Sequence, residues 1–378
     1  MSKYLRDPWV ALGAGTATVT ALYALSCLPW VRKKLNELGF CGEDPLYDYL
    51  DSLNRKVALT LHNKSLIGVD DLSVPQIQCI FEMAEFFRVQ MKRNRHFKLL
   101  ADKVITTLFY EPSTRTRCSF ESAMLKLGGK VVTVSDVTSS SVKGETLEDS
   151  VRVLSSYCDL VVVRHPENNA LQRVKHHSLV PLINAGDGSG EHPTQALLDV
   201  YTLSMYFPHF GSPDKEFTVC LMGDLKYART THSLVRLLSR FNVVLKYVAV
   251  PSLQMPTQIQ REVEQNFAKY NIPDLAYPRQ TSFNKLSDAL ENADAIYVTR
   301  VQRERMTDAE YKTAKDAYKL DKSVMSKLSK HVKILHPLPR VDEISTEIDS
   351  DERCVFFQQA QNGLYIRMAL LYLILNSS

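Results

Sequence analysis

The residues best suited to chemistry lie in one stretch, Phe109–Glu121, which reads Phe-Tyr-Glu-Pro-Ser-Thr-Arg-Thr-Arg-Cys-Ser-Phe-Glu. The β-branched run 104–108 before it predicts a strand, and the apolar spacing after it predicts a helix that ends at Gly128-Gly129. The start of such a helix attracts anions, because its first N–H groups are unpaired and lie at the positive end of the helix dipole. Ser113 and its neighbours add several hydroxyl groups and the Arg115 guanidinium, so we predict a phosphate site rather than a merely capped helix.

Polar side chains also follow the next predicted strands. Arg164 ends the apolar run 160–163, where a guanidinium is suited to bidentate contact with an anion. After the run 180–183 and a glycine-rich turn, His192-Pro-Thr-Gln195 opens a long helix. A lone histidine is usually structural, so the motif by itself leaves its role open.

The second half of the chain repeats this pattern. Its predicted strands are 217–222, 243–250, 295–298, 332–335 and 355–357. A polar motif follows each of three of these strands. The first contains Arg229, the second is Thr299-Arg300-Val301-Gln302, and the third is His336-Pro337-Leu338-Pro339-Arg340. Arg229 and Arg300 could clamp the two carboxylates of a dicarboxylic amino acid, and Gln302 could add a hydrogen bond.

Strands that alternate with helices and end in polar loops indicate an α/β fold with ligands at the carboxyl edges of parallel sheets. We expect two doubly wound parallel-sheet domains joined by interdomain helices, at 41–192 and 193–357. The helix 194–206 crosses between them, and a C-terminal helix within 358–378 returns to pack on the first domain.

Composition is that of a globular protein. Of 378 residues, 45% are apolar and 23% charged, and a formal net charge of +4 is too small for this length to indicate nucleic-acid binding. Seven scattered cysteines favour reduced thiols over a disulfide framework. Cys118, inside the anion motif, is interpreted as a small helix residue, with a reactive thiol as the alternative.

Residues 1–40 stand apart from the predicted fold. An apolar segment at 9–30 follows Lys3 and Arg6 and precedes the basic run 32–34. It approaches the roughly 20 residues of a membrane span. It is interpreted as an organelle-targeting (plastid-type) leader or as a membrane anchor, with a cytoplasmic protein as the alternative. Any membrane contact would come only through 9–30.

The anion motif also resembles a known family. Ser113-Thr-Arg-Thr-Arg117 followed by Ser119-Phe-Glu121 resembles the carbamoyl-phosphate motif of the carbamoyltransferases, and His192-Pro-Thr-Gln195 matches that family's motif in full. The resemblance covers about Val57 to the last helix. It implies that the first domain binds carbamoyl phosphate and the second an amino acid.

The resemblance also implies roles for single residues. It implies carbamoyl-phosphate contacts by Ser113, Thr114, Arg115, Thr116, Arg164, His192 and Gln195, and by Ser139 and Lys143 of a neighbouring subunit in a homotrimer. Of these, Arg115, Thr116, Arg164, His192 and Lys143 would act in catalysis. The register of Ser139 stays open, because three serines follow one another.

The second substrate is indicated by the late motifs. Ornithine enzymes of the family carry a cysteine after the late histidine, whereas this chain has Pro337, as in aspartate-type members. The resemblance therefore implies aspartate contacts by Lys143, Arg164, Arg229, Arg300, Gln302 and the main-chain oxygens of Leu338 and Pro339, and these two oxygens would receive the amine and the carbamoyl NH₂ group. Glu111 would tie Arg229 and Arg305 together when the domains close.

The implied reaction transfers a carbamoyl group from carbamoyl phosphate to L-aspartate, which gives N-carbamoyl-L-aspartate and phosphate for de novo pyrimidine (UMP) biosynthesis. It needs no metal or organic cofactor, because phosphate is already a good leaving group. The protein's task is positioning and electrostatic stabilisation. An ornithine carbamoyltransferase and a non-catalytic relative are the alternatives.

Overall fold

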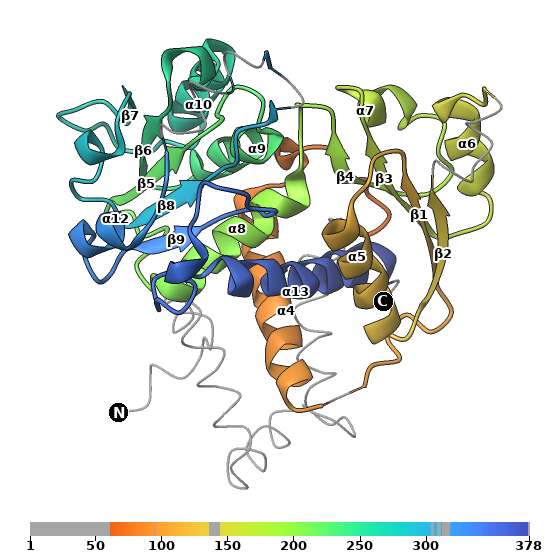
Figure 1. Cartoon of the computed structure of the whole chain (residues 1–378). Coiled ribbons are helices and arrows are strands. Elements are labelled where there is room, and N and C mark those ends of the chain that lie inside the picture. Colours follow the sequence, from red (N-terminus) through yellow and green to blue (C-terminus); the bar gives the residue numbers. More distant parts are fainter. Residues whose placement is uncertain are drawn as a thin grey trace, which may run out of the picture.

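The computed structural model describes residues 61–94, 96–135, 144–303, 306–307, 311 and 318–376, so the expected leader lies outside the described part. Two parallel sheets form its framework (Figure 1). The first contains β1 (Val104–Phe109), β2 (Lys130–Ser135), β3 (Leu160–His165) and β4 (Leu182–Asp187), in the order β2-β1-β3-β4. The second contains β5 (Phe217–Met222), β6 (Val243–Val248), β7 (Gln280–Phe283), β8 (Ala295–Val298) and β9 (Lys333–Leu335), in the order β7-β6-β5-β8-β9.

Helices connect the strands. They are α4 (Val74–Lys92), α5 (Thr114–Lys126), α6 (Leu147–Leu154), α7 (Ala170–Val174), α8 (Pro193–Tyr206), α9 (Arg229–Leu238), α10 (Thr257–Lys269), α12 (Lys322–Lys327) and α13 (Phe356–Leu375). Short 3-10 turns are η2 (Val69–Asp71), η5 (Pro251–Leu253), η6 (Leu286–Asp288) and η8 (Thr346–Ile348).

Each sheet is covered on both faces. In β3, Leu160 and Val162 belong to the large core cluster that contains α4, α5 and α13, whereas Val161 and Val163 pack with α6 and α7. Alternate residues of a strand point to opposite faces, so a continuous apolar run is what a strand buried on both sides requires. The predicted fold class, two doubly wound parallel-sheet domains, is confirmed.

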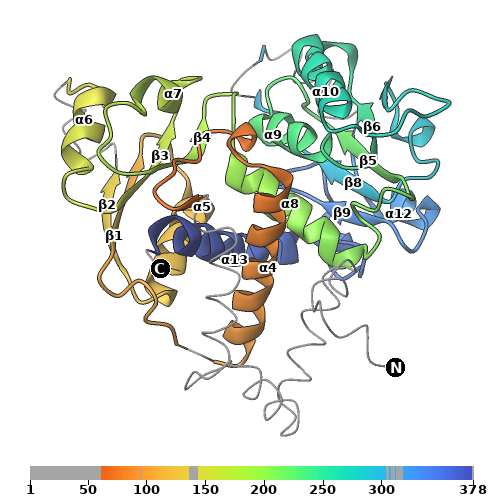
Figure 2. The same ribbon diagram turned by 180° about the vertical axis from the view of Figure 1, so that it is seen from behind.

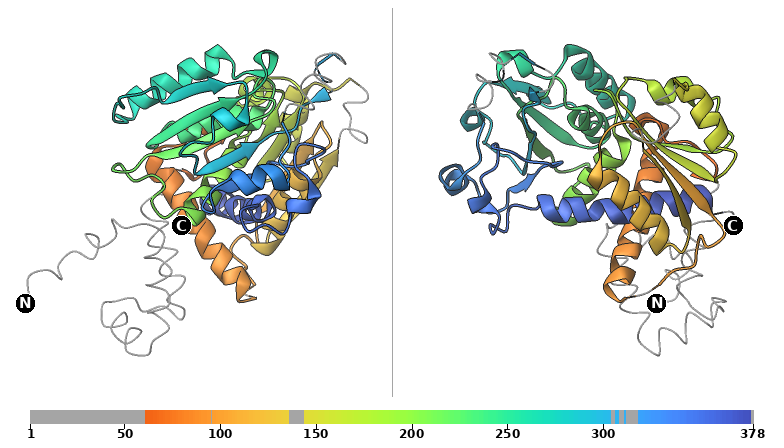
Figure 3. Two further views of the ribbon diagram at one scale, coloured as in Figure 1. Left: turned by 60° about the vertical axis from the view of Figure 1, so that its left-hand side comes forward. Right: turned by 45° about the vertical axis from the view of Figure 1, so that its right-hand side comes forward.

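Two helices link the sheets. The helix α8 follows β4, leads to β5, and lies between the two sheets in views from the front and from behind (Figures 1 and 2). The last helix, α13, follows the second sheet and packs against α4, α5 and α8, as its long course across the molecule shows in Figure 3. Ser73 and Thr146 cap the helices that follow them.

One strand prediction was wrong, and one strand was missed. Residues 355–357 do not form a strand, because α13 already begins at Phe356. Only an isolated bridge joins Cys354 to Ile334 there, and a short apolar run does not distinguish a strand from the start of a buried helix. The edge strand β7 was missed, since its sequence, Gln-Thr-Ser-Phe, lacks an apolar run.

The described residues contain no helix that is both long enough and apolar enough to cross a bilayer. The segment 9–30 lies outside them.

Helix α8 is joined to α4 by a buried hydrogen bond. The Tyr201 hydroxyl donates to Glu85 Oε2 at 2.8 Å, and Arg88 Nε donates to the same oxygen at 2.7 Å. Tyr201→Phe should lower the free energy of unfolding by about 1–2 kcal/mol, because a buried carboxylate oxygen loses a donor. The midpoint of urea denaturation measures this loss.

The matched control is Tyr277→Phe, which removes a hydroxyl that donates to Glu216 from a side chain that is 52% exposed. Water replaces that partner, so the expected loss is below about 0.5 kcal/mol. Equal losses in the two variants would contradict a special role for the bond between α8 and α4.

Candidate active site

The anion motif spans the end of β1 and the first turn of α5. Ser113 is the residue before the helix, but its hydroxyl does not cap it. Instead Ser113 Oγ accepts a hydrogen bond from Arg164 Nη1 at 3.1 Å. Thr114 and Arg115 are exposed and Thr116 is buried. The first turn of α5 therefore keeps its N–H groups and a guanidinium available for an anion.

Glu111 joins the two sheets. Its Oε2 atom accepts from Arg164 Nε at 3.1 Å and from Arg229 Nη2 at 3.0 Å. Arg164 lies in β3 of the first sheet, whereas Arg229 follows β5 of the second. Burial, and then the charge of Arg229, lower the pKa of the Arg164 guanidinium to about 10. One carboxylate oxygen thus holds two cations that would otherwise repel each other.

The turn after β4 accommodates Arg229. Arg229 Nη1 donates to the main-chain oxygen of Gly188 at 2.9 Å. Gly186 has φ +117°, and a Cβ atom there would lie 3.0 Å from Arg229 Cζ. A side chain at position 186 would therefore be strained and would displace the guanidinium.

His192 lies just before α8 and is buried. Its main-chain N–H donates to Ser233 Oγ at 2.9 Å, and its ring Nδ1 has no hydrogen-bond partner among the described residues. Burial, followed by the charges of Arg229 and Arg164, holds the pKa of His192 well below its ordinary value. The imidazole is therefore neutral and can donate one hydrogen bond to a bound group without carrying a charge.

Polar groups from the second sheet have partners of their own. Gln302 Nε2 donates to Asp224 Oδ2 at 3.3 Å, and Arg300 is half-buried just past the end of β8. The Leu338 N–H donates to His336 Nδ1 at 2.8 Å. Leu338 has φ +56°, a conformation that is costly for leucine and common at functional sites.

Some of the expected site residues are in direct contact, and others lie outside the part of the chain that the structure describes. Hydrogen bonds join Glu111, Ser113, Arg164 and Arg229. Ser139, Lys143 and Arg305 lie outside the described residues.

The sequence analysis did not identify Asp199 and Glu343, the buried partners of Gln195 and His336. Gln195 Nε2 donates to Asp199 Oδ1 at 2.8 Å. The spacing of four residues within one helix could have indicated this pair. His336 Nε2 lies 2.7 Å from Glu343 Oε1. No local sequence pattern indicates that contact.

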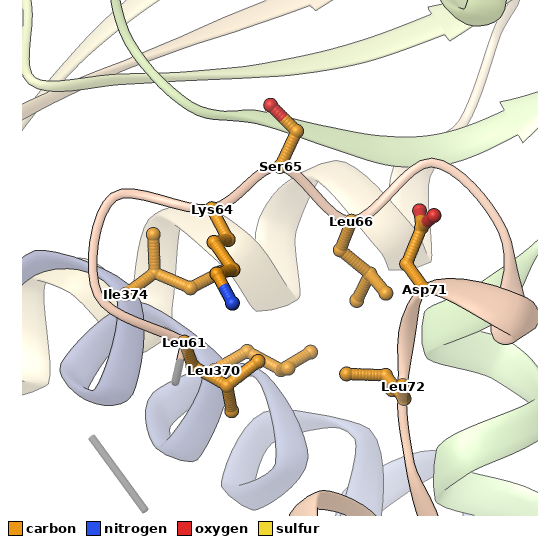
Figure 4. A pocket seen from close by; sticks show the side chains of 8 residues that line it. All are labelled: Leu61, Lys64, Ser65, Leu66, Asp71, Leu72, Leu370 and Ile374. Atoms are coloured by element: carbon orange, nitrogen blue, oxygen red, sulfur yellow. The ribbon is translucent and has the colours of Figure 1, made fainter. Parts of the chain in front are cut away.

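A separate cavity of about 240 Å³ lies between the loop that precedes α4 and the end of α13 (Figure 4). Its lining residues are Leu61, Lys64, Ser65, Leu66, Asp71, Leu72, Leu370 and Ile374. Two of its polar side chains form hydrogen bonds with the main chain. Asp71 Oδ2 accepts from the N–H groups of Ile67 and Gly68, and Ser65 Oγ accepts from the Leu182 N–H. It contains none of the expected site residues.

The fold and the site define a two-domain α/β protein that presents arginines from both sheets to anionic ligands. Two family models match the chain: the carbamoyl-P binding domain of aspartate/ornithine carbamoyltransferase over residues 64–205, and the Asp/Orn binding domain over residues 215–374. The chain belongs to the aspartate/ornithine carbamoyltransferase family.

Several similar proteins are named as aspartate carbamoyltransferase catalytic subunits. The aspartate carbamoyltransferase catalytic subunit of Thermoplasma volcanium is 43% identical over 317 residues, which are 83% of this chain and 99% of that protein. The multifunctional protein pyr1-3 of Dictyostelium discoideum is 43% identical over 316 residues, 83% of this chain, and the chain spans 14% of its length.

Among solved structures, aspartate transcarbamoylase from Trypanosoma cruzi in complex with carbamoyl phosphate and aspartate matches with a TM-score of 0.77 and 35% identity. The match covers 85% of this chain and 98% of that chain. The resemblance to aspartate-type members predicted from the sequence is confirmed.

The neutral state of His192 can be tested directly. Burial and the neighbouring arginines lower the pKa of His192 well below 6.5, the ordinary pKa of histidine. The chemical shifts of its ring carbons should therefore not change between pH 8 and pH 6.5. NMR of histidine-labelled protein measures the shift, and His192→Asn assigns the signal. A titration midpoint at or above pH 6.5 would show that the pKa of His192 is not lowered and would contradict the prediction.

Proposed function

We propose that this protein transfers the carbamoyl group from carbamoyl phosphate to L-aspartate, giving N-carbamoyl-L-aspartate and phosphate in pyrimidine biosynthesis. One observation carries the proposal: Arg164 and Arg229, from the ends of different sheets, meet on Glu111 beside the Ser113 cradle. Family membership and the aspartate-type relatives support the same reaction.

Charge favours aspartate as the acceptor. Its α-carboxylate would meet Arg164 and Arg229, and its side-chain carboxylate would meet Arg300, with Gln302 adding a hydrogen bond. Ornithine would instead bring a second cation next to these guanidinium groups, which costs free energy. The Trypanosoma cruzi enzyme has been solved with carbamoyl phosphate and aspartate, which supports this pair of substrates.

The chemistry follows from positioned charges. Ser113, Thr114 and Arg115 hold the phosphate, and the uncharged amine of aspartate attacks the carbonyl carbon. As the C–N bond forms, the carbonyl oxygen gains negative charge, which faces Thr116, Arg164 and neutral His192. The C–O bond to phosphate then breaks, and the departing phosphate accepts the amine proton. Preorganised donors of this kind stabilise the oxyanion without reorganisation at the moment of reaction.

The active unit in this proposal is a homotrimer with sites shared between subunits, in which Ser139 and Lys143 act on the neighbour's site. The sheet order supports it, because β2 is the outermost strand of the first sheet. Large apolar side chains are also exposed on this side: Val132 is 46% exposed, Val153 45% and Tyr157 69%. A contact with a neighbouring subunit would cover these side chains.

The domain limits 41–192 and 193–357, with the C-terminal helix in 358–378, belong to the same proposal. So does the role of Glu111 as a latch, which would hold Arg229 and Arg305 when both substrates are bound. Its present contacts with Arg164 and Arg229 support that role.

The reaction is tested with purified protein, carbamoyl phosphate and either L-aspartate or L-ornithine. We expect N-carbamoyl-L-aspartate from the first mixture and no citrulline from the second, since only aspartate matches the arginines. Product is measured by mass spectrometry, with Arg115→Ala as the inactive control. Citrulline as the main product would identify an ornithine enzyme, and no product from either would identify a non-catalytic relative.

The shared site is tested by mixing inactive variants. Arg115→Ala and Lys143→Ala trimers should each lose about 100- to 1000-fold in turnover, as expected for loss of a group that stabilises the transition state. After subunit exchange, about one quarter of the sites should regain both intact residues, because each site needs one subunit of each kind in a fixed order. Turnover before and after exchange measures the recovery.

The control exchange mixes two differently tagged Arg115→Ala preparations, which should regain nothing. If native mass spectrometry shows mixed trimers but turnover does not rise, each site is built from one subunit alone.

A further inference from the structure

We propose that Asp199 and Gln359 are positioning residues that allow the site to distinguish a carbamoyl group from an acetyl group. The inference rests on the proposed function and on the contacts that the family resemblance implies for the carbamoyl group, by Gln195 and by the main-chain oxygens of Leu338 and Pro339. Neither positioning residue touches the substrate in this account. They orient the groups that do.

Asp199 collects three donors in the interior. It is fully buried on α8. Its Oδ1 accepts from Gln195 Nε2 at 2.8 Å and from Gln359 Nε2 at 2.6 Å, and its Oδ2 accepts from the Tyr297 hydroxyl at 2.8 Å. A carboxylate has no proton to donate, so the Gln195 amide must turn its nitrogen to Asp199. This leaves the Gln195 oxygen as the acceptor that the proposal assigns to a carbamoyl N–H group.

Gln359 extends this arrangement to the second carbamoyl contact. Its nitrogen donates to Asp199, and its oxygen accepts from the His336 main-chain N–H at 2.8 Å. The His336 ring accepts the Leu338 N–H at 2.8 Å and contacts Glu343 at 2.7 Å. These bonds hold Leu338 in its costly φ of +56°. One buried chain of hydrogen bonds thus joins Gln195 to the Leu338 peptide.

In the proposed complex, the oxygen atoms at both ends of this chain accept from the NH₂ group of the substrate. A carbamoyl NH₂ group has two N–H donors, whereas the methyl group of acetyl phosphate has a similar size and none. Correctly oriented acceptor oxygens stabilise bound carbamoyl phosphate. With acetyl phosphate the same buried oxygens would have no donor, and an unpaired buried polar group is the usual source of strong discrimination. The phosphate and the carbonyl oxygen are common to both ligands.

The test measures each ligand separately. Gln359→Met keeps the side chain's length but removes both of its hydrogen bonds. We expect kcat/KM for carbamoyl phosphate to fall about 10- to 100-fold, the range for a lost acceptor geometry at a buried polar contact. The inhibition constant of acetyl phosphate, measured in competition with carbamoyl phosphate, should change less than about threefold. All assays are run at pH 8, because burial raises the pKa of Asp199 to about 7 and its ionised form is the one under test.

The matched control is Gln358→Met, one position earlier on the same helix. Gln358 Nε2 donates to Gln361 and Asn362 of its own helix, α13, so neither ligand should be affected. Asp199→Asn is the second variant, because an amide offers one acceptor oxygen to three donors. It should show the same selective loss, and it replaces Gln359→Met if circular dichroism shows that the latter is unfolded.

Three outcomes would overturn the inference: equal losses for the two ligands, no loss for either, or a wild-type protein that binds acetyl phosphate as tightly as carbamoyl phosphate. The last result needs no variant. A wild-type protein that forms no N-carbamoyl-L-aspartate would instead overturn the proposed function, so the two failures are distinguishable.

Discussion

The structure depends on how Glu111 balances the positive charge of the site. Arg164 and Arg229 carry like charges and repel each other. Burial adds the free-energy cost of removing a guanidinium group from water. The shared Oε2 atom of Glu111 offsets both effects with two charge-assisted hydrogen bonds. The remaining arginine contacts, to Ser113 Oγ and to the Gly188 oxygen, are neutral. Removing this carboxylate would therefore deprive Arg164 and Arg229 of the ion-pair partner that they share.

Behind the charged surface, the interior holds polar groups that are paired with one another. Asp199, Gln359 and His336 lie on α8, α13 and the loop after β9, and their hydrogen bonds cross between elements that are far apart in the sequence. Buried polar groups of this kind cost free energy unless they are satisfied, and once satisfied they define a single arrangement. The two linking helices thus do more than cover the sheets, because they also carry the buried polar side chains that pair with one another.

Much of the fold could be predicted from the sequence, for simple reasons. Strands buried on both faces must be apolar throughout, so β1, β3 and β5 appear as short runs of β-branched and aliphatic residues. The exceptions have equally simple causes. The edge strand β7 is half solvated and lacks such a run, and the apolar residues at 355–357 satisfy a buried helix start as well as a strand.

The sequence by itself determined which residue types stand at which strand ends, and hence an anion site, the family and an aspartate-type acceptor. Those features depend on neighbours along the chain, whose spacing is visible without a structure. The tertiary structure alone decided that Ser113 binds Arg164 rather than capping α5, that Glu111 is shared between two arginines, and that Asp199 meets Gln359. These contacts join residues from 51 to 160 positions apart, and such pairings arise only when separate elements pack together.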